Sequence, residues 1–235
     1  MTTVLRKSDN RRLRKTAEST IWETFDAASA QTLARSFANL IALDEIHIPP
    51  LGALPERAQG GEFFTYVHRG AISQKNAQQS RIALAGEFQS ASVRDCHNET
   101  NASANDWAHI FRLRLRFATE REDCAGFEVT QKERFTAAER RNTRCIVATS
   151  NVSQRALPLR ASASIYSSIL EKGHHIVHAL HPSRSAWLHV IVGRVLVNTY
   201  ELYQGDGLGL RNTPAISITA KEDSEVLFVE SHSAD

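Results

Sequence analysis

Histidines are the most conspicuous chemistry-bearing residues of this 235-residue chain, and six of its ten lie in the C-terminal half. Four of these six fall in the run HHIVHALH (174–181), which looks like a metal cluster because imidazole is a common metal ligand. Spacings of three and four residues share a face on a helix but not on a strand. We therefore do not expect these imidazoles to converge in a β-rich chain, and a second metal site here is the weaker alternative.

Another pairing of acid and imidazole lies in the run EFFTYVH (62–68). On a strand, alternation with a period of two puts Glu62, Phe64, Tyr66 and His68 on one face. If that face points into a barrel, Glu62 and His68 could join other ligands around a metal ion. If it points outward, both are ordinary exposed polar groups. The sequence leaves the two alternatives open.

Other arrangements that could carry catalysis are weaker. Cys96 precedes His97, but neighbouring strand residues point to opposite faces, so we expect no Cys–His dyad. The run GDGLG (205–209) looks superficially like a phosphate loop, yet no Lys-Ser/Thr ending and no helix follows it, which predicts a β-turn. The sequence shows no Ser-His-Asp signature and no nucleophile elbow.

The elements that position these groups are predicted to be short strands. Residues 108–117, AHIFRLRLRF, alternate polar and apolar types and place His109 and Phe111 on one face, with three arginines on the other. We interpret the arginine face as solvated. Turn residues recur about every ten positions through the C-terminal half, which favours an all-β sandwich or barrel over βαβ units.

The two halves of the chain echo each other. Each has a strand that ends in glycine, TYVHRG and WLHVIVG, and each has a later glycine-acid turn, Gly86-Glu87 and Gly205-Asp206. The pattern predicts a duplicated barrel. We expect an N-terminal barrel over residues 1–125, and a connecting segment with a C-terminal barrel over 126–235.

Composition narrows the class of protein. Hydrophobic residues make up 42% and charged residues 23% of the chain, as in an average globular protein. A net charge of +2 gives no reason to expect nucleic-acid binding. No apolar stretch approaches the roughly 20 residues of a membrane span. Three cysteines without a CxxC pair, and a first segment without the apolar region of a secretion signal, favour the cytoplasm.

Several segments in order resemble the pirin family of bicupins, which includes bacterial proteins described as quercetin 2,3-dioxygenases. They cover roughly 200 residues, and no single one is specific. They are LRKSDNRR followed by WETF (22–25), EFFTYVHRG (62–70), GEFQ (86–89), HNETN (97–101) with His109 beyond it, YQGDGLGL and EVLFVES. The resemblance implies an all-β fold of two tandem cupin (jelly-roll) β-barrels.

The resemblance also implies one iron ion in the N-terminal barrel, held by a His-Pro-His pair and a His-x-Glu pair. Such an open-sided set suits Fe, Ni or Mn. Here His97 and Glu99 match the second pair, whereas Leu54-Pro55-Glu56 stands where the first is expected. Leu54 cannot bind a metal, and Glu56 could. The candidate metal ligands are His97, Glu99, Glu56, Glu62 and His68.

Two functions follow from this departure. The first is a bicupin with a degraded site, non-catalytic or binding a divalent metal weakly, that acts through a small aromatic molecule or a protein partner. The alternative is a metal-dependent dioxygenase of the quercetin type, in which Glu99 takes a proton from the substrate while the metal binds the deprotonated hydroxyl and O₂. The missing histidine pair favours the first. The sequence predicts no membrane association and leaves the oligomeric state open.

Overall fold

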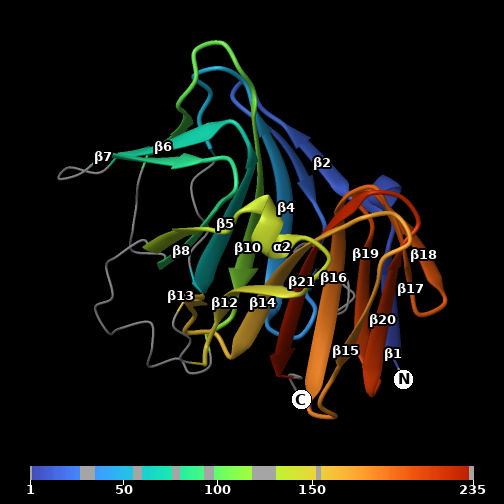
Figure 1. Ribbon diagram of the computed structural model, residues 1–235. Helices are drawn as coiled ribbons and strands as arrows, with labels where there is room; N and C mark the ends of the chain where they lie inside the picture. The colour runs from blue at the N-terminus through green and yellow to red at the C-terminus, as the bar shows by residue number, and fades with distance from the viewer. Residues whose placement is uncertain are drawn as a thin grey trace.

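The chain folds into strands arranged in four antiparallel-rich sheets, which build two barrels side by side (Figure 1). The computed structural model describes residues 2–26, 35–54, 60–75, 80–92, 98–117, 131–151 and 155–232. Helix within them comprises a 3-10 turn, η1 (Ser8–Asn10), α2 (Ala137–Arg140) and the single residue Arg35. The predicted all-β bicupin is confirmed. No helix in these residues is long and apolar enough to cross a membrane.

The N-terminal barrel pairs a seven-stranded sheet with a three-stranded one. The large sheet runs in the order β11 (Gln131–Arg134), β8 (Glu87–Ser92), β5 (Glu62–Arg69), β10 (Ala108–Leu115), β4 (Leu40–Ile48), β3 (Thr20–Glu23) and β2 (Arg12–Lys15). The small sheet runs β7 (Ser80–Leu84), β6 (Ala71–Lys75) and β9 (Asn98–Asn101).

The C-terminal barrel pairs a seven-stranded sheet with a four-stranded one. The large sheet runs in the order β1 (Thr2–Arg6), β19 (Gly207–Arg211), β16 (Arg184–Val192), β21 (Ser224–His232), β14 (Ala163–Leu170), β12 (Cys145–Thr149) and β13 (Leu157–Pro158). The small sheet runs β15 (His175–Ala179), β20 (Ala215–Ala220), β17 (Arg194–Val197) and β18 (Tyr200–Tyr203).

Two strands cross the boundary expected at residue 125. Strand β1 opens the chain but pairs with β19 in the C-terminal large sheet, and β11 pairs with β8 in the N-terminal one. Figure 1 shows the consequence, with the blue first strand lying among the red strands of the C-terminal barrel. Each barrel therefore takes an edge strand from the sequence range assigned to the other, and the two are tied together.

The hydrophobic core has three parts. One lies inside the N-terminal barrel and one inside the C-terminal barrel. The third fills the interface between the two large sheets, which we call the inter-barrel interface. Alternation along β16 explains the arrangement, since Leu188 and Val190 point into the C-terminal barrel while Trp187 and Ile191 point into the interface. Both faces of the central strands of each large sheet are thus covered.

The face of β10 that carries the arginines is not the fully solvated surface that we predicted from the sequence. Ile110 packs inside the N-terminal barrel and Phe111 in the inter-barrel interface. Arg112 lies two residues after Ile110 on the strand, so its side chain also points into the barrel, and only 4% of it is exposed. The solvated-face interpretation is therefore wrong for Arg112. It failed because β10 lies in the middle of a sheet covered on both sides.

The run GDGLG needs its glycines for packing rather than for phosphate. Gly205 takes a φ of +82° in the turn before β19. A Cβ on Gly207 would lie 2.3 Å from Cζ2 of Trp187, and one on Gly209 would lie 2.4 Å from Cε2 of Phe37. Only glycine lets these two aromatic rings approach the β19 backbone.

Candidate functional site

Glu99 lies inside the N-terminal barrel, on β9, and is buried. Its Oε1 accepts a hydrogen bond from Gln74 Nε2 at 2.8 Å. Its Oε2 accepts one from Arg112 Nη2 at 2.6 Å, which is an ion pair between two side chains that are each about 5% exposed or less. Both carboxylate oxygens are thus engaged by protein donors, one of them cationic.

This ion pair belongs to a polar network that spans the barrel. Gln74 on β6 also donates to Gln89 on β8 at 2.8 Å, and Arg112 Nε lies 3.4 Å from the hydroxyl oxygen of Thr65 on β5. All five side chains are buried, and they come from both sheets of the barrel. Buried polar groups persist when each finds a partner, and this network supplies them.

Asp44 on β4 adds a titratable group beside the network. It pairs with Arg112 across the β4–β10 ladder. It lies two residues before the barrel-facing Ile46, so its side chain points to the same side. Burial, and then the neighbouring carboxylate of Glu23, raise the pKa of Asp44 to about 7, although nearby guanidinium groups oppose the shift. Asp44 therefore changes charge close to neutral pH.

The predicted ligand segments are neighbours. The Leu54 amide donates to the Glu99 carbonyl at 2.8 Å, and Ala53 bridges Thr100. The side chain of Leu54 is buried in the apolar core of the barrel. Glu56 and His97 lie outside the described residues, as do Cys96 and Cys124.

Glu62 and His68 do not join Glu99. The alternation expected along β5 is present, but the face that carries both residues points into the inter-barrel interface, so both alternatives from the sequence are wrong. Glu62 is buried, and its Oε2 accepts hydrogen bonds from the amides of Arg160 and Ala161 at 2.9 and 3.1 Å. His68 Nδ1 lies 3.4 Å from Glu225 Oε2 of the C-terminal barrel. The second barrel covers this face, which alternation alone cannot reveal.

A metal ion does not fit the described part of the N-terminal barrel. Leu54 offers no ligand atom, and Arg112 places a positive charge on Glu99, the expected carboxylate ligand that lies inside the barrel among the described residues. Gln74 and Arg112 occupy both oxygens of Glu99, so the carboxylate has no free oxygen directed at an ion. We therefore derive no reaction step through a metal at this position.

A second cluster lies in the inter-barrel interface, where three adjacent strands each supply a histidine. His47 pairs with His109 across the β4–β10 ladder, with ring centroids 4.2 Å apart. His68 on β5 comes next, with its ring centroid 5.0 Å from that of His109. We call His47, His109 and His68 the histidine ladder.

Glu45 lies two residues before His47 on β4 and points to the same side of the strand. Its Oε1 is 3.0 Å from His109 Nε2 and 3.5 Å from His47 Nε2, and its Oε2 accepts a hydrogen bond from Arg11 Nη1 at 2.6 Å. Burial opposes ionisation of Glu45, but its contacts with both imidazoles and with Arg11 hold its pKa far below the ordinary value. Burial lowers the pKa of His109.

Behind the ladder, a buried ion pair links the two barrels. Arg140 Nη1 donates to Glu225 Oε1 at 2.7 Å, and the Tyr66 hydroxyl donates to the same oxygen at 2.6 Å. Burial opposes ionisation of Glu225, but contacts with His68 and Arg140 lower its pKa to about 2. Arg140, Tyr66 and Glu225 thus connect the two barrels through this interface.

His189 on β16 is a fully buried histidine whose ring nitrogens both lack a hydrogen-bond partner in the part of the chain that the structure describes. Burial lowers its pKa to about 4. The ring is therefore neutral at physiological pH.

Sequence reasoning missed Arg112 and the ladder. The signal for the ladder was present in LDEIHI (43–48) and AHIF (108–111), where Glu45, His47 and His109 each alternate with apolar residues. The order of the strands could not be read from the sequence, and only the pairing of β4 with β10 brings these residues together.

The C-terminal histidine run behaves as expected for a strand. His175 is exposed, whereas His178 is buried, with its Nε2 2.7 Å from Glu230 Oε2. The structure does not gather the run around one point.

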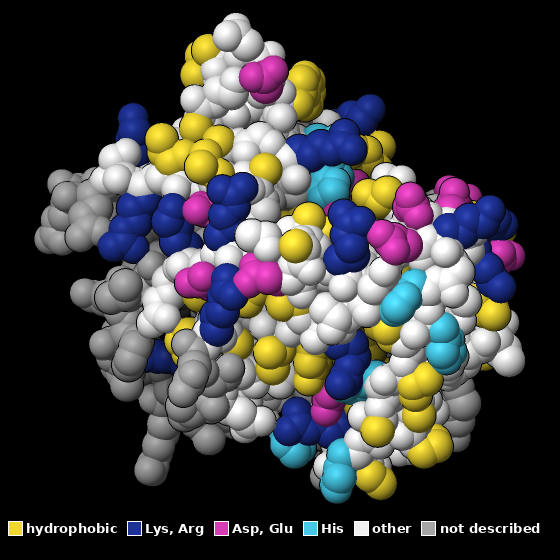
Figure 2. All heavy atoms as spheres, viewed as in Figure 1, with side chains coloured by type: hydrophobic (Ala, Val, Ile, Leu, Met, Phe, Trp, Pro, Cys, Tyr) yellow, Lys and Arg dark blue, Asp and Glu magenta, His cyan; other side chains and the backbone are white. Residues whose placement is uncertain are grey.

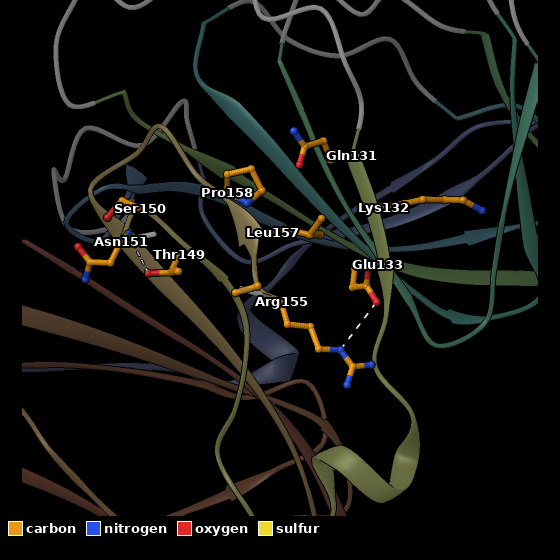
Figure 3. Close-up of a pocket in the computed structure, with 10 residues that line it drawn as sticks. Gln131, Lys132, Glu133, Thr149, Ser150, Asn151, Arg155, Leu157 and Pro158 are labelled. Carbon is orange, nitrogen blue, oxygen red and sulfur yellow. Dashed lines mark hydrogen bonds and ion pairs between the residues drawn. The ribbon is translucent and has the colours of Figure 1, made fainter. Parts of the chain in front are cut away.

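An open groove of about 400 Å³ lies where the two large sheets end, between β11 and β13 (Figure 3). Arg155 crosses it toward Glu133, with Nε and Oε1 3.9 Å apart, and Leu157 and Pro158 form its wall. On the face in Figure 2, the described basic and acidic side chains interleave without a continuous basic patch. The groove brings no metal ligands or nucleophile together.

The two sheet pairs define a bicupin, and comparison with known proteins gives its family. Residues 146–230 match the quercetinase C-terminal cupin domain. A pirin-like protein of Caulobacter vibrioides is 31% identical over 192 residues, which cover 80% of each chain. A quercetin 2,3-dioxygenase of Escherichia coli K12 is 28% identical over 172 residues, covering 72% of this chain and 71% of that one. The chain belongs to the pirin family.

A solved structure shares the whole fold. The nickel(II) complex of the bacterial pirin YhhW from Escherichia coli superposes with a TM-score of 0.87, at 24% identity, over 99% of this chain and all of that one.

Proposed function

We propose that this pirin-family bicupin is a binding protein whose N-terminal barrel works without a metal ion. The observation that carries the proposal is the buried ion pair between Arg112 and Glu99, with Nη2 and Oε2 2.6 Å apart. A guanidinium neutralises the carboxylate that the family resemblance assigns to the metal. A fixed positive charge in a buried site replaces the charge that an ion would supply.

The chemistry of the barrel suits a small hydroxylated aromatic molecule. The Arg112 guanidinium and the Gln74 amide donate hydrogen bonds, while Glu99 and Gln89 accept them, and the carboxyl group of Asp44 lies on the same barrel-facing side. Apolar walls such as Ile72 and Val67 surround these groups. Binding pockets for small molecules combine such walls with a few fixed polar groups.

Calorimetric titration of the tag-free protein with quercetin, in the presence of EDTA, tests the proposal. We expect saturable binding without metal, weakened at least about tenfold by Arg112→Gln because a charged hydrogen bond contributes about 1.5–3 kcal/mol. Arg116→Gln is the matched control, since Arg116 is exposed just beyond β10, and it should bind like wild type. Binding that requires added metal would contradict the proposal.

The alternative remains a metal-dependent dioxygenase. Its support is that Glu99 stands at the ligand position implied by the family, that relatives are named quercetin 2,3-dioxygenase, and that a structural neighbour holds nickel. Oxygen uptake with quercetin, after loading with Fe(II) or Ni(II), separates the two. We expect no oxygen uptake above that given by the free metal ion with quercetin. Turnover that Glu99→Gln abolishes would establish the alternative. That the protein acts in the cytoplasm, and that it acts through a protein partner, both stay predictions.

A further inference from the structure

We propose that Glu45, His47 and His109 form a divalent transition-metal site in the inter-barrel interface, separate from the interior of the N-terminal barrel. The ligand atoms of these three residues, one carboxylate oxygen and two imidazole nitrogens, all lie within 4.8 Å of one another. Two histidines and one carboxylate leave open positions on an ion and suit Fe(II), Ni(II), Co(II) or Zn(II).

The spacings match those of neighbouring ligands on one ion. Glu45 Oε1 lies 3.0 Å from His109 Nε2 and 3.5 Å from His47 Nε2. Metal–nitrogen and metal–oxygen distances of about 2.0–2.2 Å place adjacent ligand atoms about 3.0–3.5 Å apart in octahedral or tetrahedral geometry. The carboxylate oxygen therefore already lies at a suitable spacing from each imidazole nitrogen to share one ion with it.

The two imidazoles have unused nitrogens at this point. His47 Nε2 and His109 Nε2 are shielded from solvent, and neither makes a hydrogen bond of good geometry among the described residues. Buried polar atoms without partners cost free energy. An ion between them and Glu45 would satisfy both atoms at once.

Arg11 orients the carboxylate without taking its ligand atom. Its Nη1 donates to Glu45 Oε2 at 2.6 Å and leaves Oε1 toward the imidazoles. Hydrogen bonds of this kind fix metal-binding carboxylates. The contrast with Glu99 is direct, because there Gln74 and Arg112 occupy both oxygens and the described neighbour is Leu54 rather than two imidazoles.

An ion can reach the site from solvent beside His47. The side chain of His47 is 37% exposed, while those of His109 and Glu45 are 15% and 8% exposed. Trp22 packs edge-on against the His47 ring, with centroids 4.8 Å apart, and forms one side of the opening.

Titration with Co(II) tests the proposal, because its visible absorption reports ligation directly. We expect tag-free, EDTA-treated wild-type protein to bind one ion per chain, with an absorption band and a raised melting temperature. His47→Gln should weaken binding at least about tenfold, in line with losses seen on disturbing metal sites. Since His47 is partly exposed, this variant should keep its circular dichroism spectrum.

Two further variants make the test specific. His175→Gln changes an exposed histidine on β15 and should leave Co(II) affinity unchanged. Glu99→Gln alters only the N-terminal barrel and should also leave it unchanged. Absence of stoichiometric binding, or equal binding by His47→Gln and wild type, would overturn the proposal. Loss of binding in Glu99→Gln alone, with a circular dichroism spectrum like that of wild type, would place the ion in the barrel instead, and would contradict the proposed function as well.

Discussion

Arg112 Nη2 lies 2.6 Å from Glu99 Oε2, deep inside the N-terminal barrel. The pair joins β10 of the large sheet to β9 of the small sheet, so it also closes the barrel across its interior. An imidazole-carboxylate metal site and a guanidinium-carboxylate ion pair both neutralise a buried acid. This chain uses the second at the position where its family resemblance implies the first.

Breaking the ion pair on one side should destabilise the protein. Arg112→Met leaves Glu99 charged and buried, which costs about 3–5 kcal/mol. Urea unfolding followed by circular dichroism measures the loss. Arg116→Met should change stability by no more than about 0.5 kcal/mol. The double variant Arg112→Met/Glu99→Gln should recover part of the loss, and strict additivity would argue against the pairing.

His189 should make stability depend on pH. Its pKa falls from 6.5 to about 4 in the fold because of burial, and the charged groups facing it are Arg11, Glu45 and Asp206. Between these pH values the unfolded chain binds a proton that the folded chain does not, so stability is full above about pH 6.5 and falls as pH drops toward 4, by up to roughly 3 kcal/mol.

The matched variant is His189→Leu, which has similar volume and no titratable group. Unfolding free energies of both proteins at pH 7.5 and pH 5 should show that wild type loses more than the variant on acidification. Equal losses would mean that His189 is protonated in the folded protein.

Gly209→Ala should strain the packing of β19. The new Cβ would lie 2.4 Å from the Phe37 ring, and overpacking of this kind costs about 1–3 kcal/mol. Thermal melts should show a lower midpoint, and Phe37→Leu combined with Gly209→Ala should restore part of it. A melt unchanged by Gly209→Ala would show that Phe37 does not pack on this strand.

Glu62→Gln should affect stability and not metal affinity. The carboxylate accepts two amide hydrogen bonds from the C-terminal barrel and one from the Ser90 hydroxyl. Weakening them costs about 1–3 kcal/mol because the groups are buried. Chemical unfolding and Co(II) titration of the same variant separate the two effects, and a change in affinity at unchanged stability would contradict this placement.

The fold was predictable from sequence because alternation and turn residues are local. The strand at 108–115 and the turn at Gly205 follow from pattern and spacing, and the position of Glu99 beside the 53–54 segment follows from the family resemblance. Burial of both faces of the large sheets was not predictable, because it depends on the second barrel. That is why Arg112 looked solvated and why Glu62 and His68 looked like barrel residues or surface groups.

The inter-barrel cluster was hidden for a related reason. Glu45 and His109 are 64 positions apart in the chain, and His68 lies on a third strand. Their contact depends on the strand order β5-β10-β4, which no local pattern specifies. Glu62 and His68, suggested as ligands by strand alternation, lie instead against the second barrel.

The metal content of the N-terminal barrel tests the central claim most directly. Tag-free His47→Gln protein, which lacks one ligand of the inter-barrel site, is incubated anaerobically with Ni(II), desalted and analysed for nickel by elemental analysis. The Arg112–Glu99 pair predicts nickel far below one ion per chain, and no further decrease with Glu99→Gln added. About one ion per chain, lost when Glu99 is replaced, would contradict the account.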